Sequence, residues 1–227
     1  MHLPVSALPG RMFARAQRAL LCLTCLALLL TGCSGPDGTE RFSPLAPGTV
    51  VLVVGDSLVA GTGAPRGNGW PEALARLTGW QVINGGVPGD TSANALRRLD
   101  GLIAEYQPEA ILIAVGGNDF LRNIPPDITR DNIAEMIGTS RAVTDHVGIV
   151  AIPAKSMGAA LIGSLSDHGL FDALAREHDV ALIPAVVAAV LSRDDLRADR
   201  IHANERGYIE MAEGIHKALA GSGWIEH

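Results

Sequence analysis

The chain has 227 residues, a formal net charge of −6, and a composition that is 48% hydrophobic but only 4% aromatic. This length suits one domain with a sizeable aliphatic core. The acidic balance and the lack of a basic run beyond residue 18 argue against nucleic-acid binding, because such surfaces need clustered lysine and arginine.

The first 33 residues have the pattern of a bacterial lipoprotein signal peptide. Three arginines precede a run of twelve mostly apolar residues, 19–30, which is too short for a stable transmembrane anchor. The run ends in LTGC at 30–33, which resembles a lipobox, the motif whose cysteine is lipidated and becomes the mature N-terminus. An ordinary signal peptide or an uncleaved anchor is the alternative interpretation.

Cleavage before Cys33 would remove Cys22 and Cys25, so the mature chain could form no internal disulfide. The expected location is the bacterial cell envelope, with the protein held to a membrane from the periplasm by lipid on Cys33. Ser34 after the cysteine is typical of sorting to the outer membrane in enteric bacteria. Residues 34–48 hold three prolines and three glycines, and we predict a flexible tether there.

From residue 49 onward, short apolar runs alternate with amphipathic ones. Strands are predicted about every thirty residues, the length of a βα unit, at 49–54, 80–83, 110–115, 148–152 and 180–183. Helices are predicted from Trp70-Pro71 and at 92–105, 130–144, 168–178, 185–191 and 205–220, with Thr91 or Asp90, Thr129 and Asn204 as N-caps. Because the strands are apolar throughout, both faces of the sheet should be covered. The fold class is therefore α/β, a three-layer α/β/α sandwich with about five parallel strands.

Ligands of such sheets bind beyond the carboxyl ends of the strands, where this chain has polar or glycine-rich segments. These are Gly55-Asp56-Ser57-Leu58, the stretch 84–92 that includes Gly89, Gly116-Gly117-Asn118-Asp119, and, before the last helix, Asp199-Arg200-Ile201-His202. The phosphate-loop motif with lysine, the dinucleotide motif GxGxxG and the GxSxG of α/β-hydrolases are all missing from the sequence. It also has no HExxH and no cysteine cluster, so we expect neither a catalytic metal nor a cofactor.

Together, these four segments resemble the motifs of the SGNH or GDSL-type hydrolases, and they occur in the same order. Within that family, the chain is similar to the bacterial branch of esterases, arylesterases, thioesterases and lysophospholipases. The resemblance spans about 49–220, and we predict a hydrolase domain over 49–227. It implies a flavodoxin-like sheet and hydrolysis of carboxylic esters or thioesters.

The same residues can be given roles from their chemistry, and the resemblance implies the same assignments. A serine hydroxyl is a weak nucleophile that needs an adjacent base, which His202 can supply for Ser57. If their segment forms a helical turn, Asp199 shares a face with His202 and can bind its other ring nitrogen. Backbone N–H groups of Ser57 and Gly89 and the side-chain amide of Asn118 are the predicted oxyanion-hole donors.

The predicted function is hydrolysis of small acyl esters through an acyl-enzyme on Ser57, with thioesters and lipid substrates such as lysophospholipids within its scope. The alternatives are a glycan O-acetylesterase of the envelope and a non-catalytic binding lipoprotein on the same fold. Asp56 and Asp119 are interpreted as structural hydrogen-bond partners. The acyl pocket is expected to involve Phe120, Leu121 and Ile124 and the loop 153–167, which resembles a specificity loop of this branch.

Overall fold

The computed structural model describes residues 42–154 and 165–226. Within them, five strands form one sheet: β1 Val50–Gly55, β2 Gln81–Gly86, β3 Ala110–Ala114, β4 His146–Val150 and β5 Ala181–Ile183. Their order is β2-β1-β3-β4-β5, and every neighbouring pair is parallel. The predicted signal peptide, Cys33 and the first part of the predicted tether lie outside the described residues.

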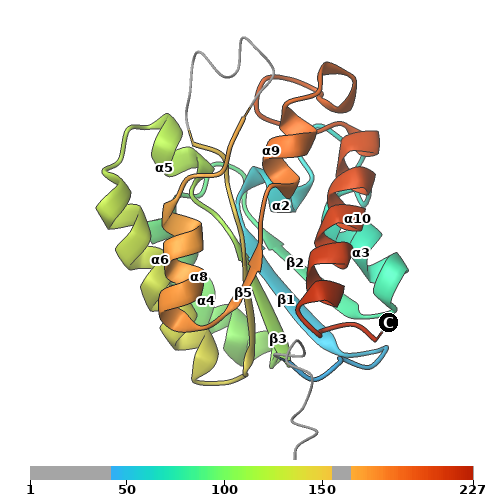
Figure 1. The fold of residues 1–227 in the computed structure, drawn as a ribbon, viewed down its shortest axis with the longest axis vertical. Helices are drawn as coiled ribbons and strands as arrows, with labels where there is room; N and C mark the ends of the chain where they lie inside the picture. Colours follow the sequence, from blue (N-terminus) through green and yellow to red (C-terminus); the bar gives the residue numbers. More distant parts are fainter. Residues whose placement is uncertain (1–41, 155–164, 227) are drawn as a thin grey trace, which may run out of the picture. The chain divides into compact units, whose positions relative to one another are not determined.

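Helices cover both faces of this sheet (Figure 1). One face carries α4 Ser92–Tyr106, α6 Pro126–Arg141 and α8 Leu170–His178, and the other carries α3 Trp70–Thr78, α9 Val186–Leu191 and α10 Glu205–Gly221. Three short elements lie near the carboxyl ends of the strands: α2 Ser57–Ala60, α5 Gly117–Leu121 and the 3₁₀ turn η1 Asp194–Leu196. The predicted three-layer sandwich with five parallel strands is confirmed.

The core follows from the apolar strands. Residues 51–54 of β1 are fully buried, and all five residues of β3 are buried. On the helices, one apolar stripe faces the sheet; in α10 it consists of Tyr208, Met211, Ile215 and Leu219, at helical spacing. No helix within 42–154 or 165–226 has the length and apolar character needed to cross a membrane.

One predicted helix start is wrong. The helix expected from residue 130 with Thr129 as its cap begins at Pro126, and Pro125 is its N-cap. Proline is preorganised for the first helical turn and has no N–H to leave unsatisfied there. Thr129 lies inside the helix, fully buried, and its hydroxyl donates to Asp119 Oδ1 at 3.3 Å. The caps at Thr91 and Asn204 are confirmed.

The end of the predicted tether packs onto the domain. The Ser43 carbonyl lies 2.8 Å from His146 Nε2, and the N–H of Leu45 donates to the carbonyl of Trp224 at 2.8 Å. The Phe42 ring meets the Trp224 ring edge-on, with centroids 5.9 Å apart. From Phe42 onward the tether interpretation is therefore wrong, because apolar and backbone groups there have partners on the domain.

Two glycines let α2 approach the sheet closely. A Cβ at Gly86, the last residue of β2, would lie 2.3 Å from the backbone nitrogen of Ala60 in α2. A Cβ at Gly55, the last residue of β1, would lie 2.3 Å from the carbonyl oxygen of Ala114 and 2.4 Å from Val59 Cγ2. Any side chain at either position would push α2 outward.

Gly86→Ala is expected to lower the free energy of unfolding by about 1–3 kcal/mol or more, because the added methyl overlaps backbone that cannot rotate away. Urea denaturation followed by circular dichroism measures this change.

The matched control is Gly101→Ala. Gly101 lies in the middle of α4, and a Cβ there meets nothing within 4 Å. Alanine should stabilise this helix by roughly 0.5–1 kcal/mol. Equal unfolding midpoints for Gly86→Ala and the wild type would contradict the close approach of α2.

Candidate active site

The four predicted segments meet around one point of the sheet edge. The chain leaves β1 towards β2 on one side and leaves β3 towards β4 on the other, so a crevice opens between the ends of β1 and β3. Gly55 is paired with Gly86 of β2 and Ala114 of β3, which brings the turns after these three strands to the same level. Ser57 and Asn118 lie at this switch point.

Ser57 is the first residue of α2, and its position is fixed by Asp56. The Asp56 carboxylate caps the helix, with Oδ1 accepting the N–H of Leu58 at 3.0 Å. Its Oδ2 accepts from Asn118 Nδ2 at 3.3 Å. Burial raises the pKa of Asp56 to about 6, although the Leu58 N–H, His202 and the Asn118 amide each oppose that rise. Near neutral pH the ionised carboxylate can accept both bonds, as expected for a structural partner.

His202 reaches Ser57 from a short loop ahead of α10. Its Nε2 lies 3.0 Å from Ser57 Oγ, and its Nδ1 lies 2.8 Å from Asp199 Oδ2. Because an ionised carboxylate can only accept, Nδ1 carries the proton in the neutral ring. Nε2 is then free to accept the proton of the Ser57 hydroxyl.

The loop that joins Asp199 to His202 is not the helical turn expected from their spacing. An antiparallel bridge between Arg197 and Ala203 closes it, and Asp199 Oδ1 accepts the N–H groups of Ile201 and His202, both at 2.8 Å. The two side chains still meet, because the carboxylate folds the loop around itself.

Electrostatics at Asp199 favour its charged form. Partial burial by itself would raise the pKa of Asp199, but hydrogen bonds from His202 and from the N–H groups of Ile201 and His202 outweigh it and bring the pKa below its ordinary value. The Asp199 side chain is 55% exposed and that of His202 is 14% exposed. Asp199 is therefore an ionised orienting group close to solvent.

Asn118 lies on α5, beyond the end of β3, with its amide turned towards the other segments. Its Nδ2 donates to the Asp90 carbonyl at 3.0 Å as well as to Asp56 at 3.3 Å. Gly89 has a φ of 85°, a conformation that only glycine adopts without strain. Its carbonyl accepts from Arg122 at 2.8 Å. The structure thus brings Ser57, Gly89, Asn118 and His202 to one edge.

Two arginines that sequence reasoning missed tie these turns together. Arg98 donates through Nε to Asp90 Oδ2 and through a terminal nitrogen to the Gly55 carbonyl, both at 2.8 Å. It therefore links the turn before Ser57 to the residue after Gly89, while Arg122 holds Gly89 itself. A lone arginine on a helix has no sequence pattern that distinguishes a structural hydrogen-bond donor from a solvated charge, so these roles could not be predicted.

Behind Asn118, a fully buried carboxylate fixes the start of α4. Asp119 accepts the N–H of Ser92 at 2.8 Å, the Ser92 hydroxyl at 2.5 Å and the Thr129 hydroxyl at 3.3 Å. Asn132 in turn donates to the Ser92 hydroxyl at 2.9 Å. With all these donors already aimed at it, Asp119 has a structural role, as its interpretation from sequence supposed.

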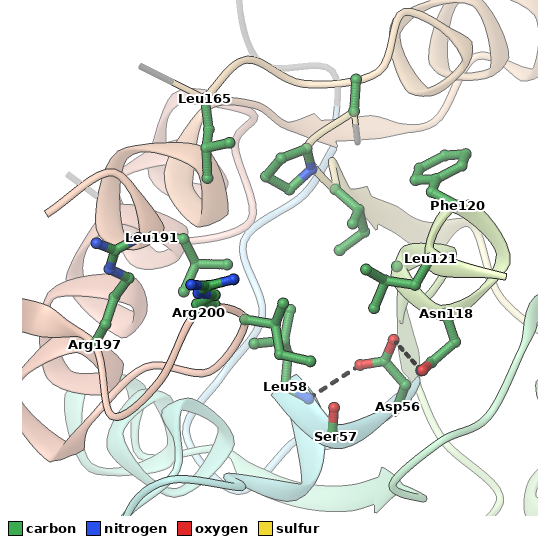
Figure 2. A pocket seen from close by; sticks show the side chains of 15 residues that line it. Asp56, Ser57, Leu58, Asn118, Phe120, Leu121, Leu165, Leu191, Arg197 and Arg200 are labelled. Atoms are coloured by element: carbon green, nitrogen blue, oxygen red, sulfur yellow. Dashed lines mark hydrogen bonds between the residues drawn. The ribbon is translucent and has the colours of Figure 1, made fainter. Parts of the chain in front are cut away.

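A mostly apolar cavity of about 280 Å³ opens beside Ser57 (Figure 2). Phe120 and Leu121 line it, as predicted, whereas Ile124 is not among its lining residues. Leu165 of the predicted specificity loop also lines it, whereas sequence reasoning missed the lining residues Ile152 after β4, Leu191 at the end of α9, and Arg197, Arg200 and Ile201 of the loop before α10. Pro153 of the predicted specificity loop lines the cavity, but residues 155–164 of that loop lie outside the described residues.

Within the two described segments, no group of three or more His, Cys, Asp or Glu side chains is arranged to hold a metal ion. The polar groups at the sheet edge are thus a hydroxyl, an imidazole, a carboxylate and amide N–H donors. This set suits nucleophilic attack on a carbonyl, with the developing negative charge received by the N–H groups.

Comparisons with known proteins agree with this chemistry. The model of the GDSL-like lipase/acylhydrolase family matches residues 53–208. Esterase TesA of Pseudomonas aeruginosa is 32% identical over 210 residues, covering 90% of this chain and 92% of the relative. The arylesterase of Vibrio mimicus is 30% identical over 74% of this chain and 87% of its own length.

The thioesterase 1/protease 1/lysophospholipase L1 of Escherichia coli K12 is also 30% identical, over 77% of this chain and 85% of the relative. Among solved structures, a crystal structure of TesA has a TM-score of 0.67 and 28% identity, covering 75% of this chain and 98% of that one. With the matched family model reaching from β1 to α10, the chain belongs to the GDSL-like lipase/acylhydrolase family and is a serine ester hydrolase.

Proposed function

We propose that the enzyme cleaves carboxylic esters through an acyl-enzyme on Ser57, with His202 as general base and Asp199 as the orienting carboxylate. The observation that carries the proposal is the unbroken hydrogen-bond chain from Asp199 Oδ2 to His202 Nδ1 at 2.8 Å and from Nε2 to Ser57 Oγ at 3.0 Å. Names of relatives that include thioesterase and lysophospholipase support thioesters and lysophospholipids as further substrates. They do not favour the glycan O-acetylesterase or the non-catalytic alternative.

In the first half of the reaction, Ser57 Oγ attacks the ester carbonyl while His202 Nε2 takes the hydroxyl proton. The carbonyl oxygen becomes an oxyanion, received by the N–H groups of Ser57 and Gly89 and by the Asn118 amide, which turns one N–H from the Asp56 carboxylate towards it. His202 then passes its proton to the departing oxygen or sulfur, and the acyl group remains on Ser57.

In the second half, water replaces the leaving group. His202 removes a proton from the water, which attacks the acyl carbonyl, and the same N–H groups receive the second oxyanion. The proton returns to Ser57 Oγ as the acid departs. No group other than water enters, and the enzyme is regenerated.

Ser57→Ala and His202→Ala are each expected to lower kcat by about 10⁴–10⁶-fold, and the double variant by little more than either single one. The serine and histidine work as one unit, so the second loss removes nothing further. Asp199→Ala should cost less, because the His202 ring can still adopt the productive tautomer part of the time. The measurement is hydrolysis of p-nitrophenyl butyrate by purified variants with matching circular dichroism.

The matched control is His216→Ala, a histidine of α10 that does not line the cavity, and it should retain wild-type kcat. A fluorophosphonate probe should label the wild type and leave Ser57→Ala unlabelled. The mechanism would be ruled out if the fold-loss in kcat of the Ser57 and His202 double variant were the product of the two single losses. A folded His202→Ala enzyme with a normal rate would rule it out as well.

Asn118→Ala is expected to lower kcat by about 10²–10³-fold, as loss of one oxyanion donor should, with a smaller change in KM. Steady-state kinetics on the same ester measure both constants. Gly89→Ala keeps its backbone donor but imposes a strained φ, so its loss should be smaller and accompanied by reduced stability. An Asn118→Ala enzyme with unchanged kcat would remove Asn118 from the oxyanion hole.

The proposed location rests on the N-terminal sequence. We propose that the chain is a lipoprotein of the bacterial envelope, anchored from the periplasm by lipid on Cys33, with the outer membrane favoured by Ser34. The support is the apolar run 19–30 followed by LTGC at 30–33. Because one acyl chain alone binds a bilayer only marginally, stable anchoring implies more than one chain on Cys33.

Cys33→Ser is expected to abolish incorporation of labelled palmitate in cells that express the full chain, because the lipid acceptor is lost. Gel fluorography of the immunoprecipitated protein measures the label. Cys25→Ser is the matched control and should label normally, since that residue leaves with the signal peptide. Label on Cys33→Ser equal to that of the wild type would refute the lipobox.

A further inference from the structure

The active-site cavity has two chemically different ends, which lie on opposite sides of Ser57 (Figure 2). One end is apolar and is formed by Phe120 and Leu121 of α5. The other carries Arg197 and Arg200, which flank Asp199 in the loop before α10, beside the apolar side chain of Leu191. This end is positively charged although the whole chain has a formal net charge of −6.

The two arginines differ in what neutralises them. The Arg197 guanidinium pairs with the Asp194 carboxylate. Arg200 is exposed, and it has no hydrogen bond or ion pair with any residue in 42–154 or 165–226. The adjacent Asp199 carboxylate directs its oxygens to the His202 ring and to the N–H groups of the loop. Within the described part of the chain, Arg200 is therefore a cation that forms no ion pair, at the edge of a mostly apolar cavity.

Proton transfer decides which half of an ester would face Arg200. His202 must hand its proton to the departing atom, so the leaving group lies beside Nε2. Arg200 belongs to the same bridged loop as His202, whereas the oxyanion donor Asn118 belongs to α5 at the apolar end. An acyl chain would then lie along α5, and the leaving group would lie against Arg200.

We propose that Arg200 is a specificity-determining residue that selects esters whose leaving group carries a phosphate. The inference rests on the proposed ester hydrolysis at Ser57. A phosphate monoester has a charge of about −1.5 to −2 at neutral pH, and a guanidinium can bind it through two parallel N–H bonds. Both an acyl glycerol phosphate and an acyl thioester of coenzyme A supply this chemistry.

Two pairs of substrates isolate the effect of the phosphate on the rate, because the members of each pair share the acyl chain and only one of them carries phosphate. The first is octanoyl glycerol and octanoyl glycerol 3-phosphate, and the second is octanoyl-N-acetylcysteamine and octanoyl-coenzyme A. The octanoyl chain suits a cavity of about 280 Å³, which is at the small end for ligand sites. The quantity measured is the ratio of kcat/KM for the phosphate-bearing substrate to kcat/KM for its neutral partner.

Arg200→Gln is expected to lower this ratio about fivefold, the effect of one exposed charge pair. Arg200→Lys should keep part of the preference, because the charge remains but the two parallel bonds are lost. Arg97→Gln is the matched control: it removes the same charge from an exposed site on α4 that does not line the cavity, and it should leave the ratio unchanged. Circular dichroism checks the fold of each variant.

A second measurement uses the wild type alone. Its ratio should fall when ionic strength rises to about 1 M, where the Debye length is about 3 Å. A lowered ratio for Arg200→Gln in either pair supports the proposal. The pair in which the ratio falls identifies the leaving group, glycerol phosphate or coenzyme A. Equal ratios for Arg200→Gln and the wild type in both pairs, or a ratio insensitive to salt, would overturn it while ester hydrolysis stands. Lack of Ser57-dependent hydrolysis of all four esters would overturn the proposed function and this inference with it.

Discussion

The close approach of α2 to the strand ends is the constraint on which the site depends. Val59 packs against Gly55, and the backbone of Ala60 packs against Gly86, at distances that leave no room for a Cβ on either glycine. Since Ser57 begins α2, its hydroxyl is held by the sheet and is not free to move with a loop. The hydrogen bond of 3.0 Å to His202 would be lost by a shift of about 1 Å, so the fit of this short helix sets the alignment of nucleophile and base.

Two buried carboxylates, Asp56 and Asp119, hold the other segments of the active site in place through hydrogen bonds and have a structural role. Asp56 is 2% exposed and Asp119 is fully buried, which would be costly unless their oxygens were satisfied. Each receives N–H or O–H donors from a different segment: Asp56 from α2 and Asn118, Asp119 from Ser92 and Thr129. A donor that moved away would leave buried charge unpaired. The same bonds therefore stabilise the fold and keep the Asn118 amide at the level of the Ser57 turn.

Local sequence patterns were enough to predict most of the fold and the three residues of the hydrogen-bond chain at Ser57. All five strands were predicted within a few residues of their observed bounds, because apolar runs covered on both faces are continuous. The contact among Ser57, His202 and Asp199 was predicted because their residue types come after a strand or before the last helix. Arg98 and Arg122 were not found, since their acceptors lie 8 to 43 residues away and follow no local pattern. The helical turn at Asp199 was also wrong: spacing i, i+3 fits a helix, but a bridge between Arg197 and Ala203 gives the same contact.

The exposure of the two sides of Ser57 differs in a way that suits two successive half-reactions. On the side of the proposed oxyanion donors, Asn118 is half-buried and Asp56 is buried, and a lower dielectric there would strengthen N–H bonds to developing charge. On the other side, Asp199 is 55% exposed, and Arg200 and Ile201 are exposed as well. In the proposed reaction, water can reach His202 Nε2 from this open side once the leaving group departs. Because an exposed ion pair adds little stability, the two backbone N–H bonds to Asp199 Oδ1 contribute to holding this open loop in shape.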